Sequence, residues 1–330
     1  MLEKAIISWI CNKDEDLPPN DAWTLDDFMK QREGNLRGIG CEGDALFIAA
    51  KCGKTNKFFY LLNKFTLEGR EESLKESLTK TNIDGKNILH VAACFETFDV
   101  VKKVHRDNCE IIDGLIRIAS ALHIPDYVNQ QDSAWGASAL HFAARNLACN
   151  NLKALVRNGA DTKLRISSQS STASLLNAKN HTAFEHTLAS TEYDKIAKQD
   201  NIITFLFQTA IKKNDVKEQK DYKDAMLENL RKKRLMILSK PVGTDMRNEA
   251  VAEYEALRVS YKPLLRQHRS KGLILWYHET TGTWPYSAKQ EENEHKFFMK
   301  ELKNSAPRKA TFDSSVCVEK TKRFFGSCCS

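Results

Sequence analysis

The sequence predicts an all-α fold, with stacked helix pairs in the first two-thirds of the chain and a smaller helical module after them. Three observations support this prediction. A seven-residue pattern occurs four times, each copy starts with a residue suited to cap a helix, and a second apolar stretch follows each copy. A short helix pair cannot bury its apolar face alone, so repeated pairs are expected to stack.

Residues 1–40 lack the repeated pattern and are expected to form a helical cap. Helices around Trp9 and around residues 23–25 would cover the open end of the stack, whose apolar face would otherwise meet water. The apolar run at 5–11 is short and is followed by acidic residues at 14–16. It is therefore not expected to act as a secretory signal peptide.

The four copies read DALFIAA at 44–50, NILHVAA at 87–93, SALHFAA at 138–144 and TAFEHTL at 182–188. Their first positions share one property, since each side chain can accept a hydrogen bond from a free N–H at a helix start. These predicted N-caps are Asp44, Asn87, Ser138 and Thr182. The third positions are large apolar anchors for the core, namely Leu46, Leu89, Leu140 and Phe184. Thr187 and Leu188 replace the alanine pair in the last copy, which suggests a looser or terminal repeat.

A second apolar pattern after each copy predicts a partner helix. The patterns are Phe58, Phe59, Leu61 and Leu62; Val100, Val101 and Val104; Leu152, Leu155 and Val156; and Ile202, Ile203, Phe205, Leu206 and Ile211. Gly159 suits the left-handed position that ends a helix. Gly85 and Gly136 stand two residues before an N-cap and predict tight turns, whereas Glu42 and Asn180 occupy that place in the other copies.

The pattern resembles the T-P-L-H-x-A-A core of the ankyrin repeat, over roughly residues 41–213. The resemblance implies an ankyrin solenoid of about four diverged repeats, in which His90 and His141 hydrogen-bond to neighbouring turns and are neither catalytic nor metal-binding. The capping positions lie 43, 51 and 44 residues apart, against about 33 in a standard repeat. Insertions are therefore expected, including an extra helix near 111–122 and a loop at 167–174.

Residues 214–310 are expected to form a mostly helical module. Helices are predicted near 226–238, 250–261 and 289–303, with a short hairpin between 273 and 286. Four aromatic residues there would form either a small core or a recognition patch: Trp276, Tyr277, Trp284 and Tyr286.

Residues 311–330 form a basic tail that ends in Cys328, Cys329 and Ser330. The cysteine pair after a basic, aromatic run fits either a disordered tail with two free thiols or a lipid-modified membrane anchor. Residues 212–330 hold most of the net charge of +7. This charge would favour an acidic partner or an anionic membrane, or is simply that of a solvated helical surface.

These features predict a protein–protein interaction scaffold that binds its partner along the concave face of the repeats. Diverged repeats with insertions resemble effectors that bacteria deliver into host cells, so a host or eukaryotic protein is the expected partner. Nucleic acid is not expected as a partner, because no DNA-binding motif occurs. No cofactor, metal or catalytic residue is predicted, and the nine scattered cysteines favour a reducing, cytoplasmic location. The alternative is an enzyme whose catalytic residues lie in the last third, with candidates His268, His278, Glu279 and His295.

Overall fold

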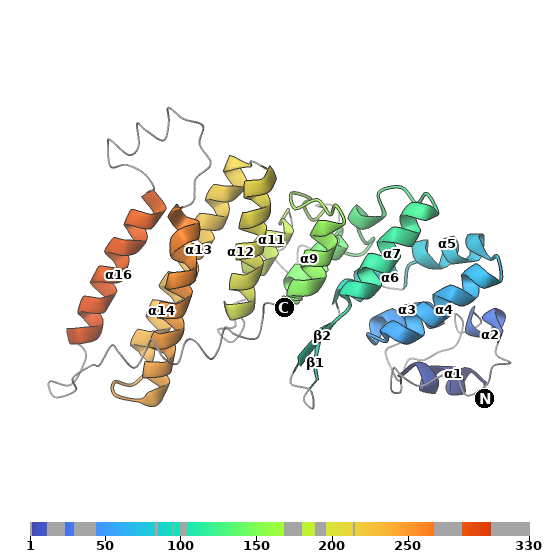
Figure 1. Ribbon diagram of the computed structural model, residues 1–330, viewed down its shortest axis with the longest axis horizontal. Coiled ribbons are helices and arrows are strands. Elements are labelled where there is room, and N and C mark those ends of the chain that lie inside the picture. Colours follow the sequence, from blue (N-terminus) through green and yellow to red (C-terminus); the bar gives the residue numbers. More distant parts are fainter. Residues whose placement is uncertain are drawn as a thin grey trace. The chain divides into compact units, whose positions relative to one another are not determined.

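The computed structural model describes residues 2–11, 24–29, 44–82, 85–94, 96–99, 104–167, 180–188, 196–213, 215–266 and 286–304 (Figure 1). These residues are mostly helical, with one two-stranded hairpin, so the predicted helical class is confirmed apart from that hairpin. The chain divides into two compact units, Met1–Ile202 and Ile203–Ser330. The division falls within helix α12 (Ile196–Lys213), whose last residue is the predicted end of the repeats.

The first unit is built from helix pairs, each with an inner helix and then an outer helix. The inner helices pack against one another in sequence order: α3 (Ala45–Lys51), α6 (Ile88–Cys94), α8 (Ala139–Arg145) and α11 (Ala183–Leu188). The outer helices form a second layer: α4 (Thr55–Leu67), α7 (Cys109–Ala121) and α9 (Cys149–Arg157). Figure 1 shows α3 beside α4 and α6 beside α7.

All four predicted N-caps form capping hydrogen bonds. Asp44 Oδ1 accepts from the Phe47 N–H at 2.9 Å, and Asn87 Oδ1 accepts from the His90 N–H at 3.1 Å. Ser138 belongs to a capping box, and Thr182 Oγ1 accepts from an N–H three residues later at 3.3 Å. Each such bond satisfies one donor that the helix itself leaves free, for about 1 kcal/mol.

The anchors at the third positions are buried as predicted. Leu46, Leu89 and Leu140 are each 1% exposed, and Phe184 is 9% exposed. Full burial of a leucine-sized side chain contributes about 1.5–3 kcal/mol. The alanine pairs of the first three copies are fully buried, which lets adjacent inner helices approach closely.

The second copy differs from the prediction. Val104 begins strand β2 (Val104–Asp107), which pairs antiparallel with β1 (Glu96–Asp99), while Val100 and Val101 lie outside the described residues. The predicted outer helix near 100–104 was therefore wrong. The helix expected as an insertion near 111–122 takes that place as α7, since its apolar face packs between α4 and α9.

A further helix, α5 (Glu71–Thr79), accounts for the long interval between the first two copies. It buries Leu74 and Leu78 and packs against α4, α6 and α7. The loop expected at 167–174 lies outside the described residues beyond Ser167.

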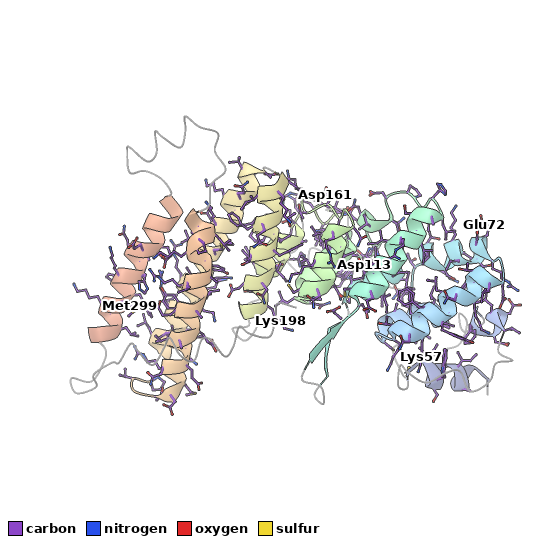
Figure 2. All side chains as sticks on the ribbon, viewed as in Figure 1. Lys57, Glu72, Asp113, Asp161, Lys198 and Met299 are labelled. Atoms are coloured by element: carbon purple, nitrogen blue, oxygen red, sulfur yellow. The ribbon has the colours of Figure 1, made fainter. Side chains whose placement is uncertain are left out.

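Helices α1 (Leu2–Cys11) and α2 (Leu25–Met29) cover the first pair, which confirms the predicted helices of the cap. Trp9 packs against Phe28 and Tyr60 with ring centroids 6.0 and 5.8 Å apart. The ammonium of Lys57 donates to the carbonyl oxygen of Trp9 and lies 5.2 Å from its ring centroid. Figure 2 shows Lys57 on α4. The apolar face of α1 is buried through Ile6 and Ile10.

The second unit contains α13 (Val216–Ser239), α14 (Asp245–Arg266) and α16 (Tyr286–Asn304), which pack against one another. The three helices predicted in this region are confirmed, and each is longer than predicted. Their shared core is aromatic in large part, with Tyr222, Tyr254, Tyr261 and Phe298 each at most 2% exposed. The predicted hairpin at 273–286, with Trp276, Tyr277 and Trp284, lies outside the described residues up to residue 285, and Tyr286 is the first residue of α16.

Candidate functional site

The histidines of the repeated pattern connect consecutive turns. His90 Nδ1 accepts from the Asn87 N–H at 3.1 Å, and its Nε2 lies 2.9 Å from the Gln130 carbonyl oxygen. Because Nδ1 accepts, the neutral ring carries its proton on Nε2 and donates it to that carbonyl. Burial lowers the pKa of His90 to about 4, so the ring is neutral at physiological pH.

His141 repeats this arrangement one copy later. Its Nδ1 accepts from the Ser138 N–H at 3.2 Å, and its Nε2 lies 3.1 Å from the carbonyl oxygen of His181. Burial also lowers the pKa of His141 to about 4. Both histidines therefore have the structural role predicted from the sequence.

The fourth copy keeps one half of this arrangement. Glu185 stands where the histidine would be, and its Oε2 accepts from the Thr182 N–H at 2.6 Å. An ionised glutamate has no N–H to donate to a further turn. Glutamate in place of histidine therefore suits the last repeat of a stack, where no further turn has to be bridged. The degenerate sequence of this copy suggested the same position.

Glycine is required where one turn lies against the next. Gly85 has φ +72°, and its carbonyl oxygen accepts from the Ser133 N–H at 3.4 Å. A Cβ at Gly85 would lie 2.0 Å from Ser133 Oγ, and one at Gly136 would lie 2.4 Å from Ser167 Cβ. Asn180 takes the same place in the fourth copy with φ +64°, so the predicted turns are confirmed at both glycines.

Two buried asparagines at the start of outer helices were missed by sequence reasoning. Asn108 Nδ2 donates to the carbonyl oxygen of Ala50 at 2.7 Å, and its backbone N–H donates to Asn151 Oδ1 at 2.9 Å. Asn151 Nδ2 donates to the carbonyl oxygens of Ala92 and Ala93 at 3.4 and 3.3 Å. These carbonyls end inner helices, so the asparagines satisfy groups that the helices leave free. An asparagine just before or within the first turn of an apolar outer helix is the signal that could have found them.

A basic patch lies next to these caps and turns, and we define it as Lys86, Trp135 and Arg145. Lys86 and Trp135 directly precede a cap and a turn glycine, and Arg145 ends α8. The Arg145 guanidinium carbon lies 4.8 Å from the Trp135 ring centroid, and Lys86 Nζ lies 5.0 Å from the Phe142 ring centroid. Both cations lie near Cys94, whose thiol pKa is raised to about 11 by burial while the two cations oppose the rise. Trp135 and Lys86 are half-buried, and Arg145 is exposed.

The patch borders a contact among three histidine rings. The His186 ring centroid lies 6.0 Å from that of His141 and 5.7 Å from that of His181. Burial, together with the nearby histidines and Arg145, lowers the pKa of His186 to about 4. Among the described residues, no group of three or more His, Cys, Asp or Glu side chains is placed to hold a metal ion.

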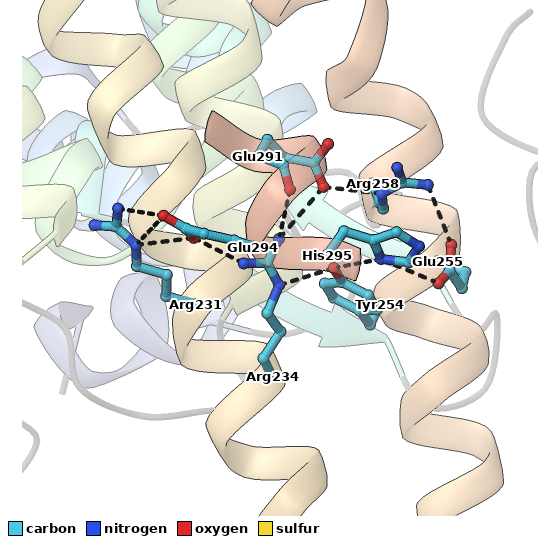
Figure 3. Close-up of polar contacts among 8 residues, drawn as sticks. All are labelled: Arg231, Arg234, Tyr254, Glu255, Arg258, Glu291, Glu294 and His295. Atoms are coloured by element: carbon cyan, nitrogen blue, oxygen red, sulfur yellow. Dashed lines mark hydrogen bonds and ion pairs between the residues drawn. The ribbon is translucent and has the colours of Figure 1, made fainter. Parts of the chain in front are cut away.

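A second polar cluster lies in the other unit, where α16 meets α13 and α14 (Figure 3). Glu291 of α16 accepts from Arg258 Nε at 2.8 Å and pairs with Arg234 at 3.3 Å. Glu294 pairs with Arg231 at 2.6 Å and with Arg234 at 2.7 Å. Each glutamate therefore binds two arginines, which fixes α16 at this position on the α13–α14 hairpin.

The same cluster contains His295, the described candidate for the enzyme alternative. Its Nδ1 lies 3.1 Å from Tyr254 Oη and 3.7 Å from Glu255 Oε1. Burial and the nearby Arg258 and Arg234 lower the pKa of His295 to about 4. The neutral imidazole of His295, enclosed among paired charges, is suited to a role in packing α16 against α14.

Several predicted candidates lie outside the described residues: His268, His278, Glu279, Cys328 and Cys329. None of the described helices is both long and apolar enough to cross a bilayer. No protein-family model matches the chain, and the comparison with curated proteins yields no match.

Proposed function

We propose that the chain is a protein–protein interaction scaffold whose first unit is an ankyrin-repeat solenoid, with a partner bound by the turns and inner helices. The observation that carries the proposal is the connected series of capped inner helices, bridging histidines and stacked turns. This series holds the basic patch in a fixed geometry.

Rigidity matters because a preorganised surface loses little conformational entropy on binding. Trp135 is fixed through its backbone N–H, which donates to Asp132 Oδ2 at 3.3 Å, and through the adjacent Gly136 turn. Trp and Arg are also the side chains that most often dominate binding energy at protein interfaces. The patch thus combines suitable residue types with a fixed backbone.

The experiment is photo-cross-linking of the full chain from two positions. Asn146 is exposed next to Arg145, whereas Arg117 is exposed on the outer helix α7. A photoreactive residue at 146 should cross-link a discrete protein in eukaryotic cells expressing the chain, and the same residue at 117 should not. Equal cross-linking from both positions, or from 117 alone, would refute the proposed face.

The resemblance to delivered effectors supports a further part of the proposal, that the partner belongs to a host cell. The partner recovered by cross-linking tests this part directly. Recovery of the same protein from the producing organism and from no candidate host would contradict it.

A further inference from the structure

We infer that the basic patch recognises an acidic segment of the partner, in which carboxylate side chains flank an apolar or aromatic residue. This inference rests on the proposed function and specifies the chemistry of the bound segment. Two cations, Lys86 and Arg145, lie near Cys94 at the junction of two turns and two inner helices.

Both nearby described carboxylates already accept hydrogen bonds within the fold. Asp132 is 3% exposed, and its two oxygens accept from the N–H groups of Ala137 and Trp135. Glu185 accepts from the Thr182 N–H and pairs with Arg165 at 3.2 Å. Among the described side chains, no carboxylate pairs with Arg145. The positive charge of this exposed guanidinium is therefore open to a ligand.

The position of the Arg145 guanidinium over the Trp135 ring determines how an anion would be bound. A guanidinium that lies over an aromatic ring uses its face for the ring and keeps its N–H edge for hydrogen bonds. That edge matches the two oxygens of a carboxylate. The half-buried Trp135 ring beside it offers apolar surface for a neighbouring side chain of the ligand.

The small number of cations favours an acidic peptide over nucleic acid. Binding to a nucleic-acid backbone depends on many phosphate contacts, and about six to ten are common. The patch supplies two cations, and the basic excess of the sequence lies in residues 212–330. A short run of carboxylates on a protein partner fits this local charge better.

The test measures binding of the full chain to labelled twelve-residue peptides by fluorescence anisotropy. The probes contain a central tyrosine flanked by glutamates, by phosphoserines or by glutamines, and a twelve-nucleotide single-stranded DNA serves as a fourth probe. The glutamate peptide should bind saturably and should bind less tightly as salt is raised. The phosphoserine arm shows whether phosphate replaces carboxylate as the source of the anion.

Charge reversal locates the site. Arg145→Glu and Lys86→Glu should each weaken binding of the glutamate peptide by about fivefold. Arg117→Glu on the outer helix should leave this binding unchanged. Arg145→Lys keeps the charge but not the planar edge, so its affinity for the glutamate peptide should lie between those of wild type and Arg145→Glu. Circular dichroism of each variant checks that the fold is kept.

Three outcomes would overturn the inference: no saturable binding of either anionic peptide, equal weakening by Arg117→Glu, or tighter binding of DNA than of peptide. None of these outcomes contradicts the proposed function. Cross-linking from position 146 tests that function separately, and it would still succeed if the partner's contact segment were neutral. If the cross-link were absent while the glutamate peptide still bound, the proposed scaffold function would be contradicted and the inferred peptide chemistry would not.

Discussion

Replacement of His90 by leucine tests the connection between consecutive turns. Leucine keeps the apolar bulk but removes the acceptor for the Asn87 N–H and the donor to the Gln130 carbonyl. Asn87 is 2% exposed, so its N–H would lose its partner in a buried place. Gln130 is half-buried, and water can recover part of the second bond. With about 1–3 kcal/mol for a buried group left unsatisfied, we expect a local loss of about 2–3 kcal/mol.

The assay is hydrogen exchange of the full chain at pH 7, followed by mass spectrometry of peptides. A loss of this size corresponds to exchange about 30- to 150-fold faster in the segments around α6 and Gln130. His90→Gln is the matched variant, since glutamine can accept from the Asn87 N–H but cannot span both partners. It should lose less protection than His90→Leu. Unchanged exchange in His90→Leu would refute the assigned role.

The same histidine predicts a pH dependence. The pKa of His90 is about 4 in the folded chain and near 6.5 when unfolded. The unfolded state therefore binds the proton more readily, and the stabilisation is fully present above pH 6.5 and is lost as the pH falls toward 4. The shift corresponds to about 3 kcal/mol. Between pH 7 and pH 5 urea denaturation of wild type should show a loss of about 2 kcal/mol of this stabilisation, because pH 5 still lies above the folded pKa. His90→Leu should show a smaller loss over the same range.

Three further predictions concern other parts of the chain. Gly85→Ala should destabilise the first unit by more than Gly159→Ala in urea denaturation. Both glycines have positive φ, but only at Gly85 would a Cβ meet a neighbouring turn; equal losses would contradict the turn packing. Glu291→Gln should lower the local stability of the second unit by about 3–5 kcal/mol, because two arginines lose a buried anion. Hydrogen exchange should then become faster in α16 and stay unchanged in α8. Replacing Cys328 and Cys329 by serine should release the chain from membranes on fractionation of eukaryotic cells; unchanged membrane association would sink the lipid-anchor hypothesis.

Local rules predicted the elements whose stability is local. The N-caps and the glycine turns depend on residues within a few positions, so Asp44, Thr182 and Gly136 could be assigned from the sequence. The histidine role came from the family resemblance. The structure then identified the carbonyl partner, which lies 40 residues further along the chain for both histidines.

The errors arose where tertiary contacts decide. Apolar residues near 100–104 fit a short helix or a strand, and the β-branched and aromatic residues around them favour strands. The more extensive apolar face of α7, with Ile111, Ile112 and Leu115 fully buried, took the outer position. The pairing of Arg234 with Glu291 joins residues 57 apart, which no local pattern reveals.

Hydrogen exchange of the full chain with and without the cross-linked partner would locate the binding face. We predict protection in α6, in the turn at residues 131–137 and in α8, with no change in the outer helices α7 and α9. Protection confined to the outer helices, or to α13, α14 and α16, would contradict a partner bound by the turns and inner helices.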